Sequence, residues 1–234
     1  MRFSIKDVIK TGFIVLVWAI IISFLIDIIF PLFIDQNYVD FVVLRERITF
    51  IFVEVVFLLV INKYLLRKNS LKWDALGFTS IDKKQIMKIF LYVFLFWILF
   101  IILVGFIMFL VLEIGKADTT GLIETSDYAG LFVFDFKILI VLLEVAILGP
   151  IVEEVIFRGG IMQALKTKFS TPVAIIGSSL AFALIHQWSI VVLPGIFIMG
   201  LLFGYLYHKF GNIYAPIGLH MLINGFNVIA VNVL

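Results

Sequence analysis

The most informative segment of the sequence is Gly149-Pro-Ile-Val-Glu-Glu-Val-Ile-Phe-Arg-Gly-Gly160, which places three ionisable side chains in a very apolar chain. Ionisable groups at membrane depth are costly, so they either pair with one another or take part in chemistry. If the segment is helical, Glu154 and Arg158 lie one turn apart on one face and can pair. Glu153 is rotated by about 100° from Glu154 in a helix of about 3.6 residues per turn. The segment therefore predicts one neutralised carboxylate, Glu154, and one available carboxylate, Glu153.

The composition is that of an integral membrane protein. Of the 234 residues, 63% are hydrophobic and 15% are charged, with a mean hydropathy of +1.20. Soluble domains have about 25% charged residues, which excludes that class. The net charge of +2 gives no argument for a nucleic-acid partner. The chain has no cysteine, which excludes disulfides, thiolate metal sites and cysteine nucleophiles.

Apolar runs separated by polar punctuation predict an all-α, polytopic fold with about seven transmembrane helices, since each span takes about 20 residues. Gly149-Pro150 predicts a kink or break within the fourth span. Gly200-x-x-x-Gly204 predicts close helix packing in the sixth. The predicted spans are residues 11–34, 47–66, 87–113, 137–168, 172–187, 190–209 and 213–233.

The distribution of basic residues predicts the orientation of the chain in a cell membrane. With a cytoplasmic N-terminus and seven spans, 14 of the 18 Lys and Arg residues fall on the cytoplasmic side and 4 outside. Because positive charge is enriched in cytoplasmic loops, the N-terminus is expected inside and the C-terminus outside. The N-terminal segment is interpreted as an uncleaved first span, since its apolar run is too long for a signal peptide.

Three further polar residues, one in the fifth span and two in the seventh, are candidates for the same site. His186 ends the fifth span, and His220 and Asn224 share one face of the seventh, which also carries Asn227. Depth can be counted from the cytoplasmic end of each predicted span at about 1.5 Å per residue. Glu153 and His186 then lie roughly 22 and 21 Å deep, and His220 and Asn224 roughly 12 and 18 Å. These depths predict that the groups share one layer. A carboxylate with an imidazole can activate water, and a second imidazole with an amide can stabilise an oxyanion.

The motifs Glu153-Glu154-x-x-x-Arg158, Phe182-x-x-x-His186 and His220-x-x-x-Asn224 resemble those of the CPBP (Abi) family. That family contains type II CaaX prenyl endopeptidases and bacteriocin-processing or bacteriocin-immunity proteins, and the resemblance covers roughly residues 136–230. It implies a catalytic membrane core over residues 136–234, preceded by residues 1–135 with three spans and a basic cytoplasmic loop.

The resemblance also implies a role for each motif residue. Glu153 and His186 would activate water, His220 and Asn224 would form the oxyanion hole, and Glu154 and Arg158 would support the site. The expected activity is that of a glutamate-type intramembrane endopeptidase that uses neither a metal nor a cofactor. The expected partners are membrane lipid and a peptide or protein substrate, prenylated or not.

Other hypotheses remain open at this point. The same pocket could bind a peptide without hydrolysis, as in a membrane accessory or immunity protein. A zinc site made by two histidines and a glutamate would leave Asn224 without a role, and a haem with two axial histidines would leave the Glu-Glu-Arg group unexplained. A proton-coupled peptide transporter is disfavoured by the lack of an inverted repeat.

Four other polar residues of the spans are assigned no catalytic role. Asp27, Glu54 and Glu144 are expected to pair with other groups or to line a cavity. Glu144 precedes Glu153 by nine residues, about 180° around an ideal helix, and is therefore not expected to share its site. His208 ends a span beside Lys209 and is expected to lie at the membrane interface.

Overall fold

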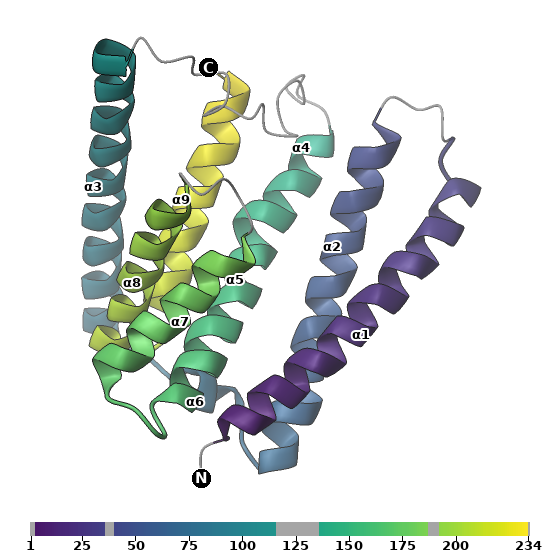
Figure 1. Cartoon of the computed structure of the whole chain (residues 1–234), viewed down its shortest axis with the longest axis horizontal. Coiled ribbons are helices and arrows are strands. Elements are labelled where there is room, and N and C mark those ends of the chain that lie inside the picture. Colours follow the sequence, from purple (N-terminus) through teal and green to yellow (C-terminus); the bar gives the residue numbers. More distant parts are fainter. Residues whose placement is uncertain (1–2, 36–39, 116–135, 187–191, 234) are drawn as a thin grey trace.

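The computed structural model describes residues 3–35, 40–115, 136–186 and 192–233, and within these ranges every regular element is a helix. The all-α prediction is therefore confirmed. The segment between the predicted third and fourth spans, residues 114–136, lies almost entirely outside the described residues. Helices α1 and α2 form a neighbouring pair on one side of the molecule, and α3 lies on the opposite side against α9 (Figure 1).

The N-terminal half contains three long helices, α1 (Ile5–Ile29), α2 (Phe41–Val60) and α3 (Lys83–Gly115). Helix α1 begins before predicted residue 11 because Ser4 caps it: Ser4 and Asp7 exchange backbone and side-chain hydrogen bonds in a capping box. Shorter elements follow α1 and α2: the 3-10 turns η1 (Phe30–Leu32), η3 (Arg67–Asn69) and η4 (Trp73–Leu76), and the π-helical segment η2 (Ile61–Leu66).

The C-terminal half begins with one unbroken helical column over residues 136–165. Its consecutive parts are α4 (Phe136–Val141), the π-helical η6 (Leu142–Leu148), α5 (Gly149–Glu154), the π-helical η7 (Val155–Met162) and α6 (Gln163–Leu165). Three helices then pack against this column and against one another: α7 (Thr171–Ile185), α8 (Leu193–Phe210) and α9 (Tyr214–Val233).

The break predicted at Gly149-Pro150 is not present. Gly149 has helical angles, with φ −52° and ψ −57°, and its N–H donates to the Glu144 carbonyl, five residues earlier. Proline lacks an N–H, and its ring clashes with the carbonyl four residues before it in an α-helix. The wider π turn before Pro150 relieves that conflict without interrupting the column.

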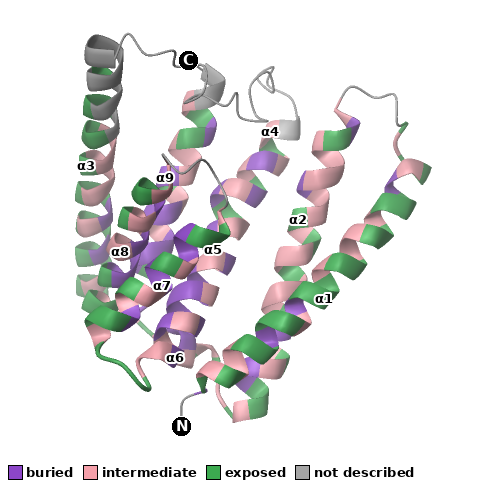
Figure 2. Cartoon of the chain, viewed as in Figure 1, coloured by how far each residue is buried: buried purple, intermediate pink, exposed green. Residues whose placement is uncertain are grey.

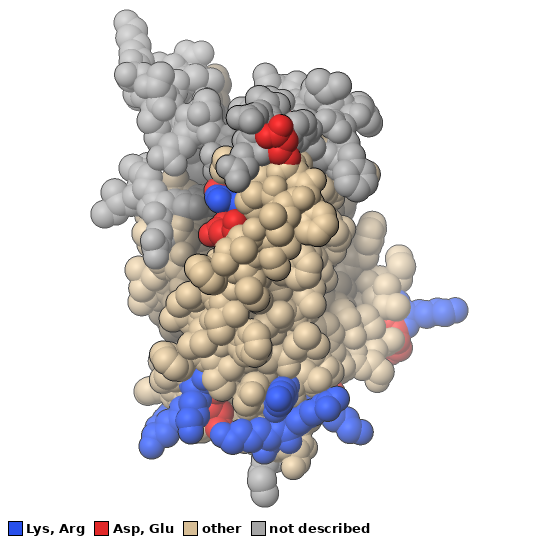
Figure 3. Space-filling model, turned by 90° about the vertical axis from the view of Figure 1, so that its right-hand side faces the viewer, with Lys and Arg blue, Asp and Glu red and all other residues tan. Residues whose placement is uncertain are grey.

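Within the described residues, four helical stretches are long and apolar enough to cross a membrane: Ile5–Leu32, Phe41–Asn69, Lys83–Leu103 and Leu193–Phe210. Large apolar side chains cover much of the outer surface, and Lys and Arg gather in a band at one end (Figure 3). The molecule is thus a multi-pass membrane protein. The number of seven spans and the cytoplasmic location of the basic end stay predictions.

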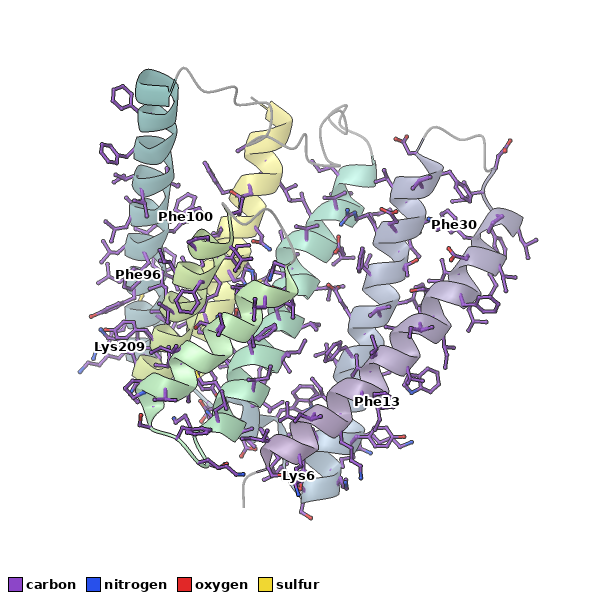
Figure 4. All side chains as sticks on the ribbon, in the orientation of Figure 1. Lys6, Phe13, Phe30, Phe96, Phe100 and Lys209 are labelled. Atoms are coloured by element: carbon purple, nitrogen blue, oxygen red, sulfur yellow. The ribbon has the colours of Figure 1, made fainter. Side chains whose placement is uncertain are left out.

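Side chains along α1 follow the same pattern. Lys6 and Phe30 lie at opposite ends of this helix (Figure 4), and Phe13 between them is 66% exposed. A large aromatic ring exposed to this extent fits a surface solvated by lipid. Buried residues instead concentrate in the column and on α8 and α9, in the middle of the molecule (Figure 2).

The small residues of α8 allow α7 to approach closely, as predicted. A Cβ atom added at Gly200 would lie 3.0 Å from Ser179 Cβ, and one added at Gly204 would lie 3.0 Å from Ile175 Cγ2. Both distances are shorter than ordinary van der Waals contact. The pair Gly200 and Gly204 therefore sets the distance between α7 and α8, and so the position of the α7 residues that face the column.

Candidate active site

Glu153 lies in the column beside a cavity of about 480 Å³. The column, α2, α7, α8 and α9 all contribute to its wall. The lining residues are Phe50, Glu54, Glu144, Val145, Gly149, Glu153, Phe182, His186, Ile196, Met199, His220, Asn224, Asn227 and Val228. The four residues predicted to be catalytic are thus brought together from three separate helical segments.

Glu154 and Arg158 form a completely buried ion pair, as the sequence predicts. Arg158 Nη1 donates to Glu154 Oε1 at 2.9 Å, and Arg158 Nη2 donates to the Gly200 carbonyl at 2.9 Å. The guanidinium carbon also lies 4.7 Å from the ring centre of Phe182 and 5.2 Å from that of Phe203. These contacts join the column to α7 and α8 behind the cavity.

The imidazole of His220 connects the two glutamates. Its Nδ1 lies 3.1 Å from Glu154 Oε1, and its Nε2 lies 3.6 Å from Glu153 Oε2. The ring stacks on Phe203 with centres 4.7 Å apart. A carboxylate can only accept, so Nδ1 carries the proton and donates it to Glu154. In the neutral ring, Nε2 then presents a lone pair toward Glu153.

His186, at the end of α7, is oriented in the same way. Its Nδ1 lies 2.7 Å from the Phe182 carbonyl, which can only accept, so Nδ1 donates there. Its Nε2 lies 4.0 Å from Glu153 Oε1. Two imidazoles therefore direct Nε2 at one carboxylate. The family resemblance implies that His186 is the imidazole that works with Glu153. In the structure, the imidazole nearer to the Glu153 carboxylate is that of His220.

Glu153 itself is held loosely. Its side chain is 28% exposed, and its Oε2 accepts no hydrogen bond from the residues that the structure describes. The separations of 3.6 and 4.0 Å from the imidazoles exceed hydrogen-bond length. At such separations, a bridging water molecule is the natural link between polar groups. The arrangement suits a carboxylate that binds a water molecule and not another side chain of the protein.

Asn224 lies one turn after His220 in α9, and both line the cavity as the shared helix face predicts. Its side-chain amide nitrogen donates to the Val145 carbonyl at 3.0 Å. Asn227 lies on the cavity as well. The amide of Asn224 is therefore anchored on the column, with its nitrogen end fixed.

Residues 135–226 match the family of type II CAAX prenyl endopeptidase Rce1-like proteins. We call this segment the Rce1-like domain, after the family that it is similar to. It contains Glu153, His186, His220 and Asn224, and it agrees with the resemblance to the CPBP family. No solved structure matches the chain significantly.

Two curated relatives share part of the chain. The "Membrane-embedded CAAX protease MroQ" of Staphylococcus aureus (strain USA300) is 32% identical over 142 residues, covering 54% of this chain and 56% of that protein. The "Putative membrane peptidase YdiL" of Bacillus subtilis (strain 168) is 38% identical over 84 residues, covering 36% of this chain and 34% of that protein. The chain thus spans about half the length of the first relative.

The expected exclusion of Glu144 from the site is wrong. Glu144 lines the same cavity as Glu153, and it pairs with Arg47 of α2, whose Nη1 lies 2.9 Å from its Oε2. The expected 180° assumed an ideal α-helix. The π turn between these residues uses more residues per turn, which offsets the two faces by about one residue, or roughly 100°. Glu144 and Glu153 therefore both lie on the cavity.

Outside the Rce1-like domain, α2 contributes Phe50 and Glu54 to the cavity wall. A Cβ atom added at Gly149 would lie 3.3 Å from Glu54 Oε1 and 3.1 Å from the Glu144 carbonyl. Glycine therefore permits α2 to approach the column one turn before Glu153. The sequence predicts Glu54 only as a pairing or cavity-lining residue, because nothing local in it links Glu54 to residue 149.

The expected pairing of Asp27 is confirmed, whereas the interfacial position expected for His208 stays a prediction. Asp27 pairs with Arg45, with 3.2 Å between Oδ1 and Nη1. His208 is exposed at the end of α8.

Among the residues that the structure describes, no group of three His, Asp or Glu side chains is placed to hold a metal ion.

Proposed function

We propose that the protein is a membrane-embedded endopeptidase in which Glu153 activates the water that cleaves a peptide bond. The observation that carries this proposal is the position of Glu153, a loosely held carboxylate facing two imidazole Nε2 atoms across a cavity. The Rce1-like domain and the protease and peptidase names of the two relatives support it. No covalent enzyme intermediate is needed, because the attacking group is water.

The first step is general-base catalysis. Glu153 takes a proton from a water held between its carboxylate and His186 Nε2, and the hydroxide forms a bond to the substrate carbonyl carbon. His186 is suited to hold that water, since its Nδ1–H is fixed on the Phe182 carbonyl and its Nε2 lone pair accepts a hydrogen bond. Positioned bases of this kind contribute about 10²–10⁴-fold to a rate.

The second requirement is stabilisation of the oxyanion. The neutral ring of His220 offers no donor at Nε2, so His220 serves this step in its doubly protonated form. It then donates Nδ1–H to Glu154 and Nε2–H into the cavity, while Glu154 and Arg158 together are neutral. The second N–H hydrogen of Asn224 is the other donor. When the C–N bond breaks, Glu153 returns its proton to the leaving nitrogen. The base, the oxyanion donors and the leaving-group acid are all side chains of this chain.

The substrate class follows from where the cavity lies. Its wall combines carboxylates, imidazoles and amides with Phe, Ile, Met and Val side chains, so it accepts a peptide backbone together with apolar groups. The cavity lies within a bundle of membrane helices, so substrates are peptides or protein segments at the bilayer. Prenylated CAAX-type C-termini are one such class, as the name of the matching family of type II CAAX prenyl endopeptidase Rce1-like proteins indicates.

The test that also identifies the substrate compares the peptides of cells that carry the wild type with those of cells that carry Glu153→Gln. Fragments present with the wild type and lost with Glu153→Gln are expected. Glu46→Gln serves as the matched control, because Glu46 lies on α2 with 44% of its side chain exposed. Identical peptides from all three strains, with equal expression, would contradict the proposal and favour a peptide-binding protein without hydrolysis.

A further inference from the structure

The Val145 carbonyl in the column lacks the main-chain donors that a helix normally provides. In an α turn the donor would be the N–H of Gly149, but that N–H donates to Glu144 instead. In a π turn the donor would be residue 150, which is proline and has no N–H. Unpaired carbonyls inside a membrane bundle are costly, so this oxygen requires a donor from elsewhere.

The donor comes from α9. Asn224 Nδ2 lies 3.0 Å from the Val145 oxygen, and Asn224 is partly buried on the cavity. Only the nitrogen end of an amide can donate, so this bond fixes which way the amide is turned. One N–H hydrogen is used on Val145, and the other remains for an acceptor in the cavity. Without the Val145 carbonyl as acceptor, the Asn224 amide could equally turn its oxygen, and not an N–H, toward the cavity.

We propose that Pro150 is a positioning residue for the oxyanion hole, acting through Val145 and Asn224. By removing the donor at position 150, it makes the Val145 carbonyl an obligatory acceptor and thereby orients the amide nitrogen of Asn224. This inference rests on the proposed function, because it assigns a purpose to that orientation. Pro150 itself touches no reacting atom.

The kinetic test uses the purified protein in lipid bilayers and a quenched peptide that carries the cleavage site found in the comparison of cells. Loss of one oxyanion donor costs about 10²–10³ in kcat, which is the effect expected for Asn224→Ala. Pro150→Ala supplies an N–H to Val145, so we expect kcat to fall by about 10-fold, a part of that loss, with KM unchanged. The double variant should be no more than about twofold slower than Asn224→Ala alone, since both changes remove the same interaction.

Two controls separate this role from general effects of proline. Pro172→Ala changes the first turn of α7, where the missing N–H has no helical partner in any case, and should leave kcat unchanged. Pro150→Gly also restores an N–H, so it replaces Pro150→Ala if that variant does not fold. Wild-type kcat in Pro150→Ala, or effects of Pro150→Ala and Asn224→Ala that multiply in the double variant, would overturn the proposal.

A spectroscopic test needs no activity. In protein labelled with ¹⁵N at asparagine, the side-chain signal of Asn224 is assigned by its loss in Asn224→Ala. In the wild type, one of its two amide protons should exchange slowly with water, and in Pro150→Ala both should exchange fast. Fast exchange of both protons in the wild type, or an unchanged slow proton in Pro150→Ala, would overturn the inference. An inactive Glu153→Gln variant should retain the slow proton, so failure of the proposed peptidase activity is distinguished from failure of this anchor.

Discussion

Arg158 is a completely buried cation with a carboxylate, a carbonyl and two aromatic rings as partners. Such a group holds the site together without reaching the cavity. Its guanidinium neutralises Glu154, whose Oε1 accepts from both Arg158 Nη1 and His220 Nδ1. The two adjacent glutamates therefore have different roles, and the difference arises from their neighbours. Glu154 orients an imidazole, and Glu153 remains available to water.

Arg158→Met should destabilise the protein strongly. Removal of one partner from a buried ion pair leaves an uncompensated charge and costs about 3–5 kcal/mol. That cost corresponds to a fall in apparent melting temperature on the order of 10 °C for a chain of this size. Arg45→Met is the matched control: its pair with Asp27 is partly exposed, so the expected cost is about 0–1 kcal/mol. Thermal unfolding in detergent measures both, and equal melting temperatures of the two variants would contradict this account.

The pairing of Glu154 with Arg158 could be predicted from the sequence because it depends only on helical spacing within one segment. The partner of Asn224 could not, since the acceptor is a main-chain carbonyl of another helix that is exposed by a local change of helix type. The Gly149-Pro150 pair did signal an irregularity. It did not say whether the chain would break or widen, because that depends on what packs around the column.

At the level of elements, the column of residues 136–165 is organised by its two π-helical segments, η6 and η7. The wide turn of η6, which lies between Glu144 and Glu153, places both on one cavity, which ideal helical geometry would not do. Local π turns of this kind are frequent at functional sites. Hydrophobic periodicity cannot reveal them, because a run of apolar residues fits either turn, and this is why the position of Glu144 was predicted wrongly.

Close packing of α7 on α8 is a second feature at this scale, and it is testable by glycine substitution. Gly200→Ala would place a methyl group 3.0 Å from Ser179 Cβ and 3.1 Å from Ser179 Cα, so the helices must separate. Overpacking of this kind costs about 1–3 kcal/mol. Gly195→Ala, in the same helix, meets nothing within 4 Å and should be neutral or slightly stabilising. Unfolding of both variants checks this, and equal stability would show that the approach of α7 to α8 is not constrained at Gly200.

For the molecule as a whole, the cavity is a joint product of the N-terminal helices and the Rce1-like domain. Helix α2 supplies Phe50 and Glu54, and the Arg47–Glu144 ion pair fastens it to the column. The predicted division at residues 135 and 136 therefore separates segments that share one site. Sequence patterns could not show this, since residues 54 and 149 meet only through the packing of distant helices.

Disruption of the Arg47–Glu144 pair should impair cleavage through the position of α2. Arg47→Glu places two like charges together and should lower both stability and cleavage. The exchange Arg47→Glu with Glu144→Arg should restore most of both, because the pair is re-formed with reversed polarity. Cleavage and unfolding are measured on the single and double variants. No recovery in the exchange would show that these residues act separately.

The absence of cysteine makes the orientation of the whole chain easy to test. Single cysteines replace Lys68, near the basic end, and Phe33, which is 81% exposed at the other end of α1. If the N-terminus is cytoplasmic, a membrane-impermeant maleimide added to intact cells should label Phe33→Cys and not Lys68→Cys. Labelling of Lys68→Cys alone would reverse the predicted orientation.

The most direct test of the central claim is cleavage of a peptide by the purified protein in proteoliposomes, carried out in ¹⁸O-labelled water. The expected result is one ¹⁸O atom in the new C-terminal carboxylate with the wild type, and loss of cleavage with correctly folded Glu153→Gln, because no base remains to activate water. Undiminished cleavage by Glu153→Gln would contradict the account.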